Sequence, residues 1–125
     1  MTEIKESSTR NLNRQLTLDC PVNYVMEKIG GYWKPIIIHQ LMSGPKRYGE
    51  LKRAIPAITE KMLIQHLKQL AADDLVVREA LEVIPPSVTY SLSPAGAELS
   101  EMMEAMVKWG LKHNDNRARY DAASA

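Results

Sequence analysis

The chain has 125 residues, of which 45% are hydrophobic, and these values fit one domain with a core of modest size. Its 16 basic residues nearly balance its 15 acidic ones, so only a local concentration of charge could indicate a nucleic-acid partner. The apolar runs are a few residues long, which excludes a membrane-spanning helix, and a single cysteine excludes a disulfide within the chain.

Residues 1–17 are polar and lack the apolar segment of a signal peptide. We expect a flexible N-terminal arm there, a folded domain over 18–113 and a loosely ordered tail over 114–125. The polar start and the single cysteine together indicate a reducing, cytoplasmic setting.

Three short helices are predicted first. One begins at Pro21 and ends at paired glycines, and one buried face is expected on it, made of Val22, Val25, Met26 and Ile29. The next has Pro35 near its start and Gly44 as its stop, and its inward residues are Ile37, Ile38 and Leu41. The third lies in "KRYGELKRAIP" and is closed by Pro56.

The stretch "PAITEKMLIQHLKQL", residues 56–70, predicts a fourth helix with two different faces. Thr59 is suited to the N-cap, because its hydroxyl can accept from a backbone N–H of the first turn. Leucines 63, 67 and 70 fall within about 60° of arc and indicate a core face. The polar residues gather on the opposite side: Lys61, Gln65 and Lys68.

The periodicity then changes to that of strands. "LVVREALEV" and "SVTYSL" are rich in β-branched residues and flank "IPPS", a pattern typical of a hairpin. A last helix follows "SPAGAELS". Four helices, a hairpin and a helix predict a mainly α fold with a small β-hairpin wing (α+β), the winged helix-turn-helix pattern.

Several motifs strengthen this prediction. The Cys-Pro start, "IGGYW", "RYGEL", "ITEKML", "VTYSL" and "AG" together resemble the HxlR-type bacterial transcription regulators, a MarR-like family, over about residues 18–112. The resemblance implies winged-helix homodimers that bind DNA. The chain departs from the family pattern at Tyr32, Pro35, Ala57 and Asp74. Asp74 replaces a glycine that begins the wing, and aspartate tolerates a left-handed backbone better than most residues.

The fourth helix is the predicted DNA-reading element. An α-helix fits the major groove, where Gln65 could pair with an adenine edge and Lys61 with guanine or phosphate. Thr59 and the free N–H groups beside it could hold a phosphate. Further cations flank the preceding helix or lie on the wing: Lys46, Arg47, Lys52, Arg53 and Arg78. Two alternatives stay open, namely a helix that is merely solvated and a winged-helix module that binds proteins instead of DNA.

The last helix carries more apolar residues than a small domain needs, which favours a homodimer interface. Its residues are Leu99, Met102, Met103, Met106, Val107, Trp109 and Leu111. Cys20 precedes Pro21 at a helix start, where the positive end of the helix dipole favours thiolate over thiol. A cysteine at this position is similar to that of redox and electrophile sensors in the family, although a buried structural thiol is an equal alternative.

A regulator without cysteine sensing is a further alternative, in which an aromatic effector occupies a Met-rich cleft between the last helix and Trp33. We expect no enzyme activity, metal or cofactor, because the chain has no Gly-rich phosphate loop and its three histidines show no zinc-ligand spacing. His66, near the polar edge of the fourth helix, is predicted to contact phosphate or solvent, and His39 to lie on a helix surface.

Overall fold

A computed structural model describes residues 19–114 of the chain. The predicted arm over 1–17 and all but the first residue of the predicted tail lie outside the described residues. The helices are α2 (Pro21–Ile29), α3 (Trp33–Leu41), α4 (Tyr48–Ala54), α5 (Glu60–Ala72), α6 (Pro94–Ala97) and α7 (Ser100–His113). The strands are β1 (Lys46–Arg47), β2 (Val76–Leu81) and β3 (Ser87–Leu92).

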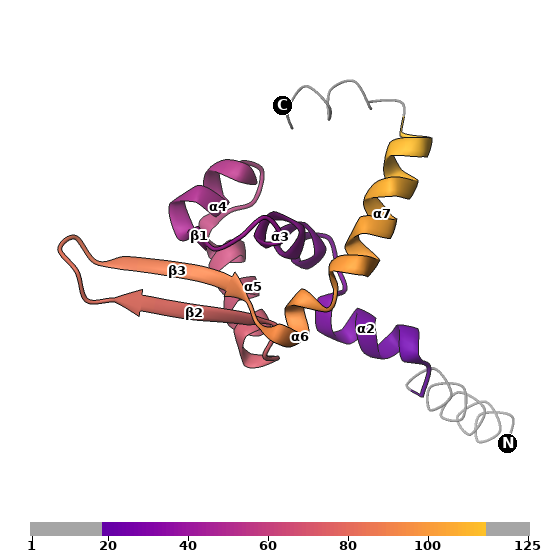
Figure 1. Ribbon diagram of the computed structural model, residues 1–125, viewed down its shortest axis with the longest axis horizontal. Coiled ribbons are helices and arrows are strands. Elements are labelled where there is room, and N and C mark those ends of the chain that lie inside the picture. The colour runs from indigo at the N-terminus through magenta and orange to yellow at the C-terminus, as the bar shows by residue number, and fades with distance from the viewer. Residues whose placement is uncertain (1–18, 115–125) are drawn as a thin grey trace, which may run out of the picture.

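The strands form one antiparallel sheet in the order β1-β3-β2. The fold is therefore mainly helical with a small sheet, and the predicted winged helix-turn-helix class is confirmed. Figure 1 shows the β2–β3 hairpin extending away from the helices, while α2 and α7 lie far from its tip. The short strand β1 was not predicted, because the sequence pattern gave its residues to the third helix.

The core lies between α3, α5 and the sheet. Leu63, Leu67 and Leu70 of α5 are buried, as the helical spacing predicted. The predicted inward residues of α3 are buried as well, and Pro35 is tolerated because it lies in the first turn. Other core residues include Leu51, Ile55, Ile58, Val76, Tyr90 and Met103.

The predicted buried face of α2 is only half correct. Ile29 is buried and Val25 packs against the core. Val22 and Met26, in contrast, are 67% and 56% exposed. The helical spacing of these four residues was identified correctly, but α2 covers the body of the domain with only one end.

Ser93, which lies between β3 and α6, holds the base of the wing through two hydrogen bonds. Ser93, which is 2% exposed, donates from Oγ to the carbonyl of Asp74 at 2.6 Å and accepts from the N–H of Gly96 at 3.0 Å. Asp74 has φ 58, so it adopts the left-handed backbone that the sequence predicted for it. Gly96 is required because a Cβ there would lie 2.1 Å from the carbonyl oxygen of Leu75.

Candidate nucleic-acid interface

Helix α5 is anchored at its start and along one side. Thr59 is its N-cap, and the Thr59 Oγ1 accepts a hydrogen bond from the backbone N–H of Met62 at 3.2 Å, as predicted. The three buried leucines fix the rotation of the helix about its axis. The residues opposite those leucines must then face outward.

The outward face of α5 carries the predicted reading residues. Lys61, Gln65 and Lys68 are all exposed, and their side chains form no salt bridge or hydrogen bond with another residue in the 19–114 range. Glu60, in the first turn, places a negative charge near the N–H groups that were expected to hold a phosphate. The donors and acceptors at the middle of the helix are therefore better placed for an anionic partner than those at its start.

The basic residues before α5 occupy different positions. Lys46 and Arg47 lie on β1, paired with Tyr90 and Thr89 of β3, and not within the third helix. They directly precede α4, with Arg47 as its N-cap, so they flank that helix as predicted. The N–H of Arg47 donates to the carboxylate of Glu50 at 2.9 Å, which caps α4.

Two more cations lie in the last turn of α4. The Lys52 ammonium donates to the carbonyl of Pro56 at 3.2 Å, so it stabilises the turn that leads toward α5. Arg53 is exposed. Its guanidinium is therefore accessible to a phosphate.

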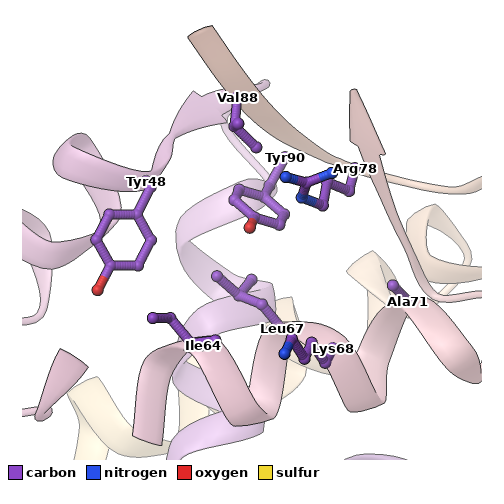
Figure 2. Close-up of a pocket in the computed structure, with 8 residues that line it drawn as sticks. All are labelled: Tyr48, Ile64, Leu67, Lys68, Ala71, Arg78, Val88 and Tyr90. Atoms are coloured by element: carbon purple, nitrogen blue, oxygen red, sulfur yellow. The ribbon is translucent and has the colours of Figure 1, made fainter. Parts of the chain in front are cut away.

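Arg78 lies on the inner face of the wing. It pairs with Tyr90 across the β2–β3 ladder, and cross-strand partners share a face. Val88, two residues from Tyr90, lies on that same face. Figure 2 shows the Arg78 guanidinium above a groove whose floor is α5, with Lys68 on the opposite side. The tip of the wing instead presents Ile84, which is fully exposed.

The groove between α5 and the wing was not predicted. It has a volume of about 640 Å³. Its lining residues are Tyr48, Ile64, Leu67, Lys68, Ala71, Arg78, Val88 and Tyr90. The sequence held part of the signal, because the period-2 alternation of a strand puts Val88 and Tyr90 on one face of the wing. The packing of the hairpin above α5 is needed to bring that face together with the helix, and the sequence does not show this packing.

His66 does not lie where the sequence predicted. The residue is half-buried on the flank of α5 near Lys34, away from the outward face, and neither ring nitrogen has a hydrogen bond of good geometry with a described residue. Burial lowers the pKa of His66 below its ordinary value, and the Lys34 charge acts in the same direction, while the nearby Gln69 side chain opposes them. A neutral, half-buried imidazole is a poor phosphate ligand, so the predicted contact is wrong. His39 is also half-buried.

The predicted interface residues of α7 divide into two groups. Met103 is 2% exposed and belongs to the core of its own chain, so its place in a dimer interface is wrong. Leu99 and Met102 pack partly against that core. Met106 and Trp109 are 52% and 68% exposed, and Val107 and Leu111 are half-buried. Exposed apolar residues also gather on and after α2: Val22, Tyr24, Met26 and Tyr32.

The Met-rich cleft differs from its prediction. A cavity of about 210 Å³ lies between α3 and α7 and is lined by Pro35, Ile36, His39, Met103, Met106 and Val107. Trp33 is not among these residues; its ring packs edge-on against Tyr32 with a centroid distance of 4.7 Å. The cleft therefore exists without Trp33 as a wall.

Cys20 is exposed and forms the N-cap of α2, without a side-chain hydrogen bond to the first turn. The alternative of a buried structural thiol is excluded by this exposure. Within residues 19–114, no three histidine, cysteine or acidic side chains gather as metal ligands. No helix in this part of the chain is long and apolar enough to cross a membrane.

Comparison with known proteins gives consistent matches. The family model described as HxlR-like helix-turn-helix matches residues 28–118. A regulatory protein of Fusobacterium mortiferum, MalR, is 45% identical over 101 residues, which are 80% of this chain and 95% of that protein. The HTH-type transcriptional regulator YkvN of Bacillus subtilis is 45% identical over 91 residues, 73% of this chain and 77% of its own length.

Solved structures agree with these matches. The oxidised form of the redox regulator HypR superimposes with a TM-score of 0.74 at 40% identity, covering 77% of this chain and 99% of that chain.

Proposed function

The chain belongs to the HxlR-like helix-turn-helix family of transcriptional regulators, and on that premise we propose that it binds a specific double-stranded DNA operator as a homodimer. Helix α5 enters the major groove, with Gln65 and Lys61 directed to base edges and Lys68 to the backbone or a base. Arg53 and Arg78 contact phosphates on either side of the helix. Lys46 and Arg47 add positive charge beside the wing, and Thr59 donates its hydroxyl proton to a phosphate near the helix start.

One observation carries this proposal. The leucine side of α5 is completely buried, while the opposite side is exposed and free of carboxylate partners among the described residues. A module that binds proteins would be expected to neutralise or scatter these charges. Here the chain as a whole is nearly neutral, yet two lysines and an amide occupy one outward face.

A homodimer explains the exposed apolar residues at the other end of the domain. Helices α2 and α7 lie far from the wing tip in Figure 1, so pairing through them leaves α5 of each copy accessible. In this proposal the exposed side chains of Met26, Met106 and Trp109 form the contact surface of the dimer. The half-buried residues of the last helix lie at its edge, namely Leu99, Met102, Val107 and Leu111. A two-fold dimer would read an inverted repeat with half-sites about 10 bp apart.

The signal that controls binding is proposed to be an oxidant or electrophile that acts on Cys20. Two observations favour this: the thiol is exposed at a helix start, and the structurally similar HypR is described as a redox regulator. Cys20 is the only cysteine, so its products would be a sulfenate, a mixed disulfide or a disulfide between subunits.

The DNA-binding proposal is tested by selecting bound sequences from a random pool and then titrating the selected operator. Lys68→Ala should weaken binding to every sequence and reduce the slope of log affinity against log salt by about 0.9 per half-site, or about 1.8 for the dimer. Gln65→Ala should instead relax sequence preference, with a loss of about 1–3 kcal/mol of discrimination.

Lys108→Ala is the matched control, because Lys108 is an exposed lysine on α7, outside the proposed DNA-binding surface. It should leave the salt slope unchanged. Wild-type affinity and specificity in both α5 variants would refute the assignment of α5 to the groove.

A further inference from the structure

The Met-rich cleft is formed by two facing stripes of side chains, one on α3 and one on α7. On α3, Pro35 and Ile36 lie four and three residues before His39, and on α7, Met106 and Val107 lie three and four residues after Met103. These spacings put each set on one face of its helix. Figure 1 shows α7 beginning beside α3, and the two helices are in contact. The cleft therefore follows from the packing of two helices of one chain.

The size of the cleft favours an ion over an organic effector. Its volume of about 210 Å³ lies below the range of roughly 300–1,000 Å³ that is usual for ligand pockets. An aromatic effector would also find a single polar side chain to fix its orientation, that of His39. A metal ion needs less room, and the donor atoms alone hold it in place.

The donor atoms that line the cleft are soft. Met103 and Met106 offer thioether sulfurs, His39 offers an imidazole nitrogen, and no carboxylate lines the cleft. Thioethers select Cu(I) among the metal ions of a cell, and imidazole also suits copper. Calcium and magnesium need oxygen ligands, and zinc is bound by thiolate, imidazole or carboxylate. The donor set therefore fits monovalent copper.

The three donors are available and lie at different depths. His39 is half-buried, and its ring makes no hydrogen bond or ion pair with any residue the structure describes. Met103 is 2% exposed and Met106 is 52% exposed, so the first lies at the floor of the cleft and the second at its mouth. Methionine has three rotatable bonds, so both sulfurs can close on an ion without a shift of the backbone.

The rest of the lining protects such an ion. Pro35, Ile36 and Val107 are apolar and half-buried, and they keep water and other oxygen donors away from the floor of the cleft. The hydrophobic shell around a metal site controls the access of solvent to the metal. A dry site with few ligands suits Cu(I) better than Cu(II), which prefers tetragonal nitrogen and oxygen ligands.

We propose that the Met-rich cleft binds one Cu(I) ion through the sulfurs of Met103 and Met106 and a ring nitrogen of His39. All three ligands belong to one chain, so the site depends on neither DNA binding nor dimerisation. The lack of zinc-ligand spacing among the histidines does not bear on it, because zinc sites do not use methionine.

A second part rests on the proposed function. Met106 lines the cleft and is also a member of the proposed dimer surface. Cu(I) holds its thioether toward α3 and so removes it from the contact with the second subunit. Copper therefore weakens the dimer and, through it, the binding of an inverted repeat.

Anaerobic titration with Cu(I) in competition with the chromophoric chelator bicinchoninate tests the site. The full chain carries Cys20→Ser in every sample, because an exposed thiol would bind Cu(I) by itself. We expect one Cu(I) per chain, which an excess of Zn(II) does not displace. Met106→Leu and His39→Gln should each weaken Cu(I) binding at least about tenfold.

The chain offers a matched control for each of these variants. Met26→Leu changes a methionine of similar exposure on α2, and His113→Gln changes a histidine at the end of α7 outside the cleft. Both controls should keep the affinity of the Cys20→Ser protein for Cu(I). Losses equal to those of Met106→Leu and His39→Gln would overturn the site, as would failure to take Cu(I) from bicinchoninate.

Nuclear magnetic resonance of the methionine methyl groups locates the ion without a substitution in the core. One equivalent of Cu(I) should shift the methyl signals of Met103 and Met106, and leave those of Met26 and Met62 in place. Shifts confined to Met26 or Met62 would mean that copper binds elsewhere, and they would refute the site.

Sedimentation of the Cys20→Ser protein with and without one equivalent of Cu(I) then tests the second part, and Cu(I) should shift it toward monomer. Bound Cu(I) with unchanged sedimentation would refute the link to the dimer and leave the site intact. A protein that is monomeric without copper would refute the proposed dimer and likewise leave the site intact.

Discussion

Replacing Ser93 by alanine should destabilise the domain strongly, although the change removes a single oxygen. The hydroxyl joins the end of β3 to two other segments: it donates its proton to the Asp74 carbonyl at the start of the wing, and its oxygen accepts a hydrogen bond from the Gly96 N–H in α6. Because the side chain is 2% exposed, water cannot easily replace either bond. The link between wing and domain depends on this residue.

The magnitude follows from the two hydrogen bonds. A neutral hydrogen bond contributes about 1 kcal/mol net, and a buried group left without a partner costs about 1–3 kcal/mol. Loss of an N-cap hydroxyl alone costs about 1 kcal/mol. Ser93→Ala should therefore lower the free energy of unfolding by about 2 kcal/mol, which corresponds to a fall in Tm of roughly 10 °C for a domain of this size.

Urea unfolding followed by circular dichroism measures this loss at a fixed protein concentration, since a dimer's apparent stability depends on concentration. Ser43→Ala is the matched control: its hydroxyl is exposed and makes one hydrogen bond, to the Gln40 carbonyl at 3.1 Å. The control should change stability by less than about 0.5 kcal/mol. Equal effects of the two substitutions would refute the role given to Ser93.

Three further outcomes are expected. Burial lowers the pKa of His66, so below the ordinary His pKa near 6.5 the unfolded chain binds more protons than the folded one. Stability is therefore full above that pH and falls as the pH drops, and His66→Gln should reduce the fall measured by urea titration. Diamide should alter the operator affinity of the wild type, and dithiothreitol should restore it, whereas Cys20→Ser should bind DNA equally in both states. In sedimentation, Trp109→Ala should weaken the dimer at least about tenfold, while Met103→Ala should mainly lower stability, by about 2–5 kcal/mol.

The sequence predicted those features that depend on local periodicity and backbone preference. The leucines of α5 repeat at helical spacing, and this spacing alone identifies the buried side and hence the exposed one. Asp74 was predicted to accept a left-handed backbone, and it does. The hairpin followed from two runs of β-branched residues around prolines, and its strands are confirmed over 76–81 and 87–92.

Features that depend on contacts distant in the chain were missed or misplaced. Strand β1 consists of two basic residues and is a strand only because β3 pairs with it. Helical spacing also cannot distinguish a residue that packs in the core of its own chain from one that is exposed and available to a second subunit. Met103 and Met106 lie three apart on α7, yet one is buried and the other is half exposed. His66 was misplaced for the same reason, because its position depends on how α3 packs beside α5.

The position of Cys20 bears on how a signal could reach DNA. Cys20 caps α2, and α2 lies far from the wing tip (Figure 1). Under the control by oxidants proposed for it, the signal acts through the relation between subunits and not by a contact with the operator. We expect the response to diamide to require the dimer, so a monomeric variant should bind the operator equally with and without diamide. A response that persists in the monomer would refute this route.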